Sequence, residues 1–177
     1  MINRIKALTT KASLPSERLD INETIRDVLV LVADRAKREA VSIRTDFADD
    51  LFAVSGDRVQ VQQVLLNLVM NAIEAMSTVG EWPRELLVYS RNIEDQVQVT
   101  VEDSGPGLDP NGMERIFDPF YTTKASGMGM GLSICRSIVQ RHGGRLWATA
   151  EHGSGTMFHV ALPKYPGEEL HAAVDGA

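Results

Sequence analysis

The stretch EDSGPGLDP at residues 102–110 is followed by IFDPFYTTK at 116–124 and by GMGMGLSI at 127–134. In this order, an acidic residue precedes Gly105 and Gly107, an irregular segment comes next, and three glycines at 127, 129 and 131 lead into an apolar helical pattern. Glycine lets a backbone turn tightly and approach a ligand closely, and the amide groups at the start of a helix attract phosphate. The stretch therefore predicts a nucleotide pocket with a mobile cover, in which the base contact comes first and the phosphate contact second.

The amino-acid composition limits the class of protein and the kinds of partner to be expected. The chain has 177 residues, of which 44% are hydrophobic, and this is enough for one well-buried core. A net charge of -6 and unclustered Lys and Arg residues argue against a nucleic-acid surface. The single cysteine, Cys135, excludes an internal disulfide. Together with the lack of a signal peptide or a long apolar run, it predicts a cytoplasmic protein.

The two ends of the chain differ from its middle. Apolar residues recur at helical spacing from Ile2 to Ala12, and Pro15 then interrupts the pattern, which predicts the end of a helix and a linker over residues 1–16. Because so short a helix is marginal in water by itself, we expect it to belong to a larger protein; a simple docking helix is the alternative. Residues 17–163 form the predicted domain, and the acidic residues 164–177 form a predicted flexible tail.

The predicted domain is of the α+β class. Asn22 is the expected N-cap of a first helix, and Asp57 is that of a second, which runs to about Met76. A third helix begins near Gly131 and ends at the Gly143-Gly144 pair, where glycine suits the left-handed closing residue. Strand patterns follow at 41–47, 51–56, 85–92 and 96–103, the last two antiparallel, and at 145–151 and 155–163 as a closing hairpin. Helices and strands are expected to share one core, with the helices on one face of the sheet.

The second predicted helix, QVQQVLLNLVMNAIEAM at residues 60–76, is apolar almost all the way round. At about 100° per residue, five of its polar residues fall within a stripe roughly 80° wide: Gln60, Gln63, Asn67, Asn71 and Glu74. Buried amides need hydrogen-bond partners, and neighbouring backbone groups would suffice for two arbitrary asparagines. Beside a glycine-rich phosphate cradle, however, oxygen ligands one turn apart predict a magnesium site.

Four segments, in this order and at this spacing, resemble the motifs of sensor histidine kinases, the enzymes of two-component signalling. The N box is resembled by QVLLNLVMNAIEAM (63–76), the first glycine box by EDSGPGL (102–108), the F box by IFDPFYTTK (116–124) and the second glycine box by GMGMGL (127–132). The resemblance covers residues 17–163 and ends in GSGTMFHVALP (153–163). It is greatest for the nitrogen-regulation and oxygen-sensing branch, in which FDPFYTTK followed closely by GMGMGLSI is typical.

The resemblance implies a Bergerat-type fold, shared with gyrase-type and heat-shock chaperone ATPases. This fold is a two-layer α/β sandwich, in which three helices cover one face of a mixed, mostly antiparallel sheet and ATP binds under a lid. The resemblance also assigns the adenine contact to Asp103. A carboxylate accepts a hydrogen bond from the exocyclic amine of adenine, whereas guanine has a carbonyl at the corresponding position. Thr156 supports the same base, directly or through water, while Gly105 and Gly107 bring the backbone close to it.

Residues 108–126 resemble the lid itself. The resemblance implies that Phe117 and Phe120 anchor this lid by packing when it is ordered, and that Lys124 reaches a phosphate as a point charge. The phosphates would also contact the second glycine box and the amide groups of the helix that follows it, at Gly127, Gly129, Gly131 and Leu132.

The N box is expected to supply the magnesium edge of the site. By resemblance, Asn71 and, with it, Asn67 orient Mg²⁺ and the phosphates, and Glu74 assists through water or forms an ion pair. With Lys124, these three residues are the expected catalytic group, whose contribution is positioning and charge neutralisation rather than a covalent nucleophile. ATP and Mg²⁺ are the expected cofactors, and ADP is the product.

The resemblance also implies partners. A sensor kinase transfers phosphate from ATP to a histidine on a dimeric helical hairpin that precedes its ATP domain, for relay to the receiver domain of a response regulator. All four histidines of this chain follow the first glycine box, and none has the setting of that acceptor. Residues 2–10, INRIKALTT, instead resemble the end of the second hairpin helix. We therefore expect a catalytic domain that is monomeric alone, dimeric within the whole protein, and separate from its acceptor histidine.

Two other functions stay open at this point, namely a free-standing ATPase and a nucleotide-gated binding module. In related hydrolytic ATPases, a glutamate one turn before the magnesium-binding asparagine activates water. Asn67 occupies that position here, which argues against hydrolysis. The binding module is not excluded by the sequence, because a domain without its histidine would look the same.

Overall fold

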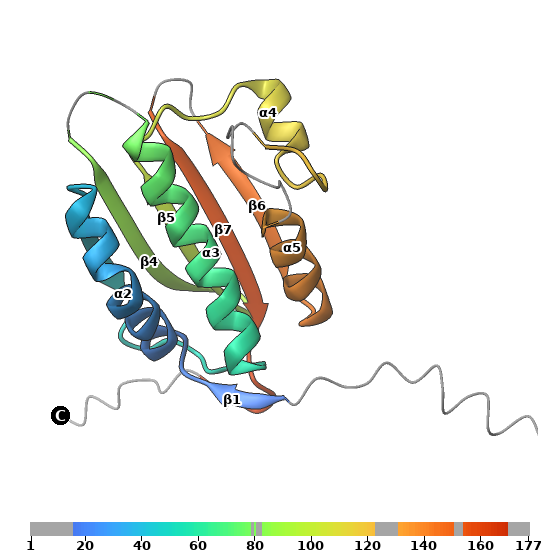
Figure 1. Ribbon diagram of the computed structural model, residues 1–177. Helices are drawn as coiled ribbons and strands as arrows, with labels where there is room; N and C mark the ends of the chain where they lie inside the picture. Colours follow the sequence, from blue (N-terminus) through green and yellow to red (C-terminus); the bar gives the residue numbers. More distant parts are fainter. Residues whose placement is uncertain (1–15, 79, 81–82, 123–130, 151–153, 170–177) are drawn as a thin grey trace, which may run out of the picture.

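The structure, a computed structural model, describes residues 16–78, 80, 83–122, 131–150 and 154–169. These residues form two layers (Figure 1). Three helices, α2 (Ile21–Arg38), α3 (Arg58–Ser77) and α5 (Gly131–Arg141), lie over one face of a five-stranded sheet, with α3 between the other two. The predicted fold class, an α+β sandwich with its helices on one sheet face, is confirmed.

The five strands are ordered β2-β4-β5-β7-β6 across the sheet. Their bounds are Ser42–Phe47 for β2, Glu85–Ile93 for β4, Gln96–Asp103 for β5, Thr156–Pro163 for β7 and Arg145–Ala150 for β6. Only β2 and β4 pair in parallel, and the other pairs are antiparallel. The sheet is thus mixed and mostly antiparallel, as expected, and both the β4-β5 pair and the closing hairpin are confirmed.

A second sheet, of two strands, is separate from the main one. The sequence did not indicate its first strand, β1 (Glu17–Leu19), which pairs antiparallel with β3 (Val54–Gly56). The segment after β7 joins this region, because the backbone N–H of Tyr165 donates to the carbonyl of Ala53 at 2.7 Å and Arg18 pairs with Glu168 at 2.6 Å. The predicted tail therefore begins against the domain, while residues 1–15 and 170–177 lie outside the described residues.

Aspartates cap the first two long helices, α2 and α3. Asp57 caps α3, because its carboxylate accepts from the N–H of Gln60 at 3.0 Å. The expected cap at Asn22 is wrong. Asp20 is the N-cap of α2 and accepts from the N–H of Glu23 at 3.0 Å, while the Asn22 amide lies inside the helix and donates to the carbonyl of Ala48 at 3.0 Å.

The core lies between the helices and the sheet. Alternate residues of β5, beginning with Val97, are buried under the helices, and α3 is buried on two sides, as Leu68 and Ile73 illustrate. Because little of α3 is exposed to solvent, the polar side chains of its stripe must contact other parts of the protein. Among the helices that the structure describes, none combines the length and the apolarity that would be needed to cross a bilayer.

Candidate functional site

The acidic residue of the first glycine-rich segment lies at the end of a central strand. Asp103 is the last residue of β5 and is paired in register with Thr156, the first residue of β7. Its side chain is buried, with 3% of the residue exposed. The N–H of Gly105 donates to Oδ1 of Asp103 at 2.9 Å. The sheet register therefore brings together three of the residues that the sequence assigned to a base contact.

Burial sets the protonation of this carboxyl. Desolvation raises the pKa of Asp103 from its ordinary value of 3.8 to about 6, against the opposing effect of hydrogen bonds from the backbone N–H groups of Gly105 and Thr156. A buried carboxylate of this kind is a strong hydrogen-bond acceptor whose remaining lone pairs need a donor. A buried, pKa-shifted acid at the end of a sheet is a typical feature of a ligand site.

Two glycines allow this arrangement. A Cβ atom on Gly105 would lie 2.8 Å from Oδ1 of Asp103 and 3.4 Å from the backbone carbon of Ala75 on α3. Gly155 has a φ of 92°, and a Cβ atom there would lie 1.8 Å from the backbone oxygen of Asp103. Sequence reasoning gave Gly155 no role, although the segment GSGT that places it before Thr156 was visible. Gly107 also has a positive φ, of 75°.

The polar stripe of α3 connects this end of the site to the second glycine segment. Ala75 contacts Gly105 at one end, and Asn67, two turns earlier, lies against Gly131 at the other, since a Cβ on Gly131 would be 2.8 Å from Nδ2 of Asn67. Four helical residues rise about 6 Å, so along α3 Asn71 lies midway between Asn67, which is against Gly131, and Ala75, which is against Gly105. Glu74, like Asn71, is half-buried.

The same stripe continues toward the start of α3, along a groove of about 350 Å³ between α3 and α5. The groove is lined by Gln60, Gln63, Pro119, Ser133, Ile134, Ser137, Ile138 and Arg141. The stripe therefore faces α5 at its beginning and the loop after β5 at its end. This path explains why five polar residues interrupt an otherwise apolar helix.

The sequence predicted an irregular backbone for the segment assigned to a lid, but this segment contains a short helix. Asp109 caps α4 (Pro110–Arg115). Phe117 then packs edge-on against Phe158 of β7 at a centroid distance of 6.2 Å, with the guanidinium of Arg136 over its ring at 5.3 Å. Phe120 is 72% exposed, and its packing in an ordered lid stays a prediction.

The remaining candidate residues are placed only in part. α5 begins at Gly131, and Leu132 follows as a half-buried residue packed on the core. Lys124, Gly127 and Gly129 lie outside the described residues. The predicted phosphate contacts of these three therefore stay predictions.

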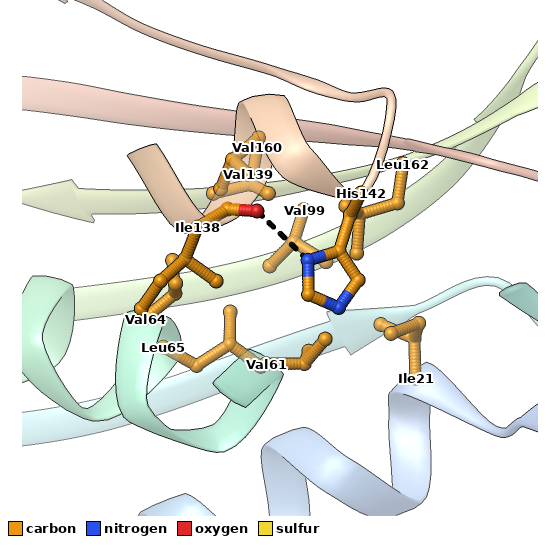
Figure 2. A pocket seen from close by; sticks show the side chains of 10 residues that line it. All are labelled: Ile21, Val61, Val64, Leu65, Val99, Ile138, Val139, His142, Val160 and Leu162. Carbon is orange, nitrogen blue, oxygen red and sulfur yellow. Dashed lines mark hydrogen bonds between the residues drawn. The ribbon is translucent and has the colours of Figure 1, made fainter. Parts of the chain in front are cut away.

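A separate cavity lies in the core and is not part of this arrangement. It has a volume of about 10 Å³ and is lined by apolar side chains of α2, α3, α5 and the sheet, with His142 at its edge (Figure 2). That volume holds one water molecule at most. The cavity is therefore a small packing gap, and the buried Asp103 carboxylate is the better indicator of a ligand site.

The comparisons with known proteins agree with this geometry. A family model described as histidine kinase-, DNA gyrase B-, and HSP90-like ATPase matches residues 56–166. The sensor histidine kinase TmoS of Ectopseudomonas mendocina is 35% identical over 165 residues, which are 92% of this chain and 17% of TmoS. The chain thus spans less than a fifth of the length of that relative.

Two solved structures show the same likeness. The nucleotide-free catalytic domain of histidine kinase ThkA is 35% identical with a TM-score of 0.75, and the match covers 84% of this chain and 95% of that one. ThkA in complex with the response regulator protein TrrA is 31% identical with a TM-score of 0.74, over 95% of this chain and 47% of that one.

Proposed function

Because the chain belongs to the histidine kinase-, DNA gyrase B- and HSP90-like ATPase family and is the ATP-binding catalytic domain of a sensor histidine kinase, we propose that it binds Mg²⁺-ATP and donates the γ-phosphoryl group to a histidine on a separate dimerisation domain. The observation that carries the proposal is the buried carboxylate of Asp103, aligned with Thr156 and Gly105 at one end of the polar stripe of α3.

Asp103 is the proposed base-recognition residue. Its carboxylate accepts a hydrogen bond from the exocyclic amine of adenine, whereas a guanine carbonyl at that position would face a second acceptor without a proton between them. Thr156 contacts one side of the base. Because Gly105 and Gly107 have no side chains, the ring can approach the backbone closely. Preference for adenine over guanine follows from this single side chain.

Mg²⁺ fits the residues of α3. Asn67 lies against Gly131, and Asn71 follows it one turn later on α3. Amide oxygens completed by water and phosphate oxygens are a donor set that Mg²⁺ accepts. When bound, the ion neutralises charge on the phosphates during transfer. Asn71 is its proposed protein ligand. Asn67 orients the phosphates, Lys124 neutralises their charge, and Glu74 assists through water or forms an ion pair.

The same residues favour transfer to a protein over hydrolysis. A hydrolytic site needs a base that activates water, and Asn67 offers a neutral amide where the hydrolytic relatives have glutamate. The phosphates are held by the start of α5 and by the glycines before it, and Phe117 anchors the lid beside them.

The proposed partners follow from the family. The acceptor is a histidine on the dimerisation domain of the same protein, which makes the whole protein a homodimer, and the phosphoryl group then passes to a response regulator, as the complex of ThkA with TrrA supports. The domain itself acts in the cytoplasm as a monomer.

A transfer assay tests the proposal. The domain is mixed with γ-labelled ATP, Mg²⁺ and a dimeric helical hairpin that carries the acceptor histidine, and label is followed on the hairpin and as free phosphate. We expect label on the hairpin, none on a hairpin with the histidine replaced by Ala, and at least tenfold less with the Asn71→Ala domain, roughly what loss of one charge-linked contact costs. Release of free phosphate at the same rate with and without hairpin would contradict the proposal in favour of an ATPase.

A further inference from the structure

The first two turns of α5 hold the side-chain amide of Asn67 from two sides. Nδ2 of Asn67 donates a hydrogen bond to Sγ of Cys135 at 3.3 Å. A Cβ atom on Gly131 would lie 2.8 Å from Nδ2 and 3.2 Å from Oδ1 of the same amide. Because Gly131 and Cys135 are four residues apart, they share one face of α5. We name this pair the amide seat.

The seat constrains the amide by shape and by chemistry. The absence of a side chain on Gly131 leaves room for the amide group to lie flat against the backbone of α5. Cys135 is fully buried, so its sulfur is shielded from solvent. Sulfur is a weak hydrogen-bond acceptor, and it occupies the NH₂ end of the amide.

Fixing one end of an amide fixes the other. With Nδ2 against Sγ, the plane of the Asn67 side chain is set, and so is the direction in which Oδ1 presents its lone pairs. An unrestrained asparagine exchanges the two ends by rotation about its last torsion, which is broad. A donor end turned toward a cation or a phosphate-bound water would be the wrong group for a ligand of Mg²⁺.

We propose that the amide seat is a positioning element of the phosphate site, in which Cys135 and Gly131 fix the amide of Asn67 so that its Oδ1 faces Mg²⁺ or a water bound to the phosphates of ATP. This inference rests on the proposed function. Cys135 is a positioning residue, since it acts through Asn67 rather than on the nucleotide. The seat also links the start of α5 to α3.

Two ligands, one with phosphates and one without, separate positioning from packing. Mg²⁺-ATP reports on both ends of the site, whereas adenosine reports on the Asp103 end alone. Affinities for both are measured by NMR titration for wild type, Cys135→Ala, Cys135→Ser and the control Val139→Ala. Val139 is buried on the same helix one turn later, so its truncation removes core packing without removing the acceptor for Asn67.

The expected result is selective. Cys135→Ala frees the amide of Asn67 to turn. Loss of one contact of that amide at the phosphates corresponds to about three- to tenfold in affinity, so the variant weakens Mg²⁺-ATP binding by about that factor and leaves adenosine binding unchanged. Cys135→Ser keeps an acceptor and stays within about twofold of wild type. Val139→Ala lowers the melting temperature and leaves both affinities unchanged. Gly131→Ala, which drives a Cβ into the amide, gives the same selective loss by a second route.

Two results would overturn the inference by itself: equal Mg²⁺-ATP affinity in wild type, Cys135→Ala and Gly131→Ala, or parallel losses for adenosine and Mg²⁺-ATP, which would indicate a general structural role. Failure of the wild-type domain to bind Mg²⁺-ATP at all would overturn the proposed function and this inference with it. The wild-type titration therefore distinguishes the two failures.

Discussion

The backbone N–H of Asp57 donates to Nε2 of His142 at 3.1 Å, which joins the N-cap of α3 to the residue that follows α5. On the other side of the ring, Nδ1 lies 2.8 Å from the carbonyl of Ile138, to which it donates (Figure 2). One ring nitrogen therefore accepts a hydrogen bond while the other donates one. The two helices that border the proposed phosphate site are thus tied at their far ends by one side chain.

His142→Ala should lower the free energy of unfolding by about 1–3 kcal/mol, because it leaves the N–H of Asp57 without this partner. Denaturation in urea measures the loss. Arg141→Ala is the matched control, since Arg141 precedes His142 and is exposed, and it should change stability by less than about 0.5 kcal/mol. Equal effects of the two substitutions would show that the bond contributes nothing.

Asp103 should make the stability of the free domain depend on pH. Its folded-state pKa, about 6, lies above its ordinary value of 3.8, so the folded state binds the proton more tightly than the unfolded state does. Its contribution is therefore most favourable below about pH 4 and is lost as pH rises through about 6, a change of roughly 2 to 3 kcal/mol. Asp103→Asn should remove this dependence, and the measurement is urea denaturation of both proteins between pH 4 and 8.

The same carboxyl should control base affinity in the opposite direction. Adenosine binding needs the acceptor form, so its affinity should fall as pH drops through about 6, by at most about tenfold per pH unit. Adenosine is the suitable probe because it has no phosphate that titrates nearby. An adenosine affinity that is constant between pH 5 and 8 would argue against Asp103 as the base contact.

Substitution by alanine should destabilise the protein far more at Gly155 than at Gly167, a glycine of similar backbone conformation. Gly155→Ala combines a φ of 92° with a Cβ 1.8 Å from the backbone of Asp103, and we expect a loss of at least about 3 kcal/mol. Gly167 has a φ of 85° with open space around it, so Gly167→Ala isolates the backbone strain, about 1–2 kcal/mol. Thermal unfolding of the two variants checks the difference.

The two phenylalanines of the lid segment should also behave differently. Phe117→Ala loses the contacts with Phe158 and Arg136 and should cost about 2 kcal/mol, less than a fully buried phenylalanine. Phe120 is exposed, and Phe120→Ala should cost less than about 0.5 kcal/mol. If both cost the same, the packing of Phe117 is not what holds the segment to β7.

Much of the fold could be predicted because it follows from local patterns. The alternation in β4 and β5, the cap at Asp57 and the glycine pair after α5 are each decided within a few residues. The cap of α2 was not, since Asp20 and Asn22 are both good capping residues. The choice was made by tertiary contacts, in which the hydroxyl of Ser90 donates to Oδ1 of Asn22 at 2.7 Å.

The candidate site was predictable in its residue types but not in its connections. The sequence pointed to Asp103 and to the stripe of α3, yet the pairing of Asp103 with Thr156 depends on sheet register across more than fifty residues. The hydrogen bond from Asn67 to Cys135 spans 68 positions, and no local sequence pattern predicts it. The exposure of Phe120 likewise depends on how the chain turns after α4, where its φ is 67°.

An NMR titration of the labelled domain with Mg²⁺-ATP and Mg²⁺-GTP shows whether ATP binds with its adenine at Asp103. We expect saturable shifts of the amide resonances of Gly105, Thr156 and Ala75 with ATP, much weaker binding of GTP, and loss of the ATP response in Asp103→Ala. Equal affinity for both nucleotides, or an unchanged ATP response in Asp103→Ala, would contradict the base contact at Asp103.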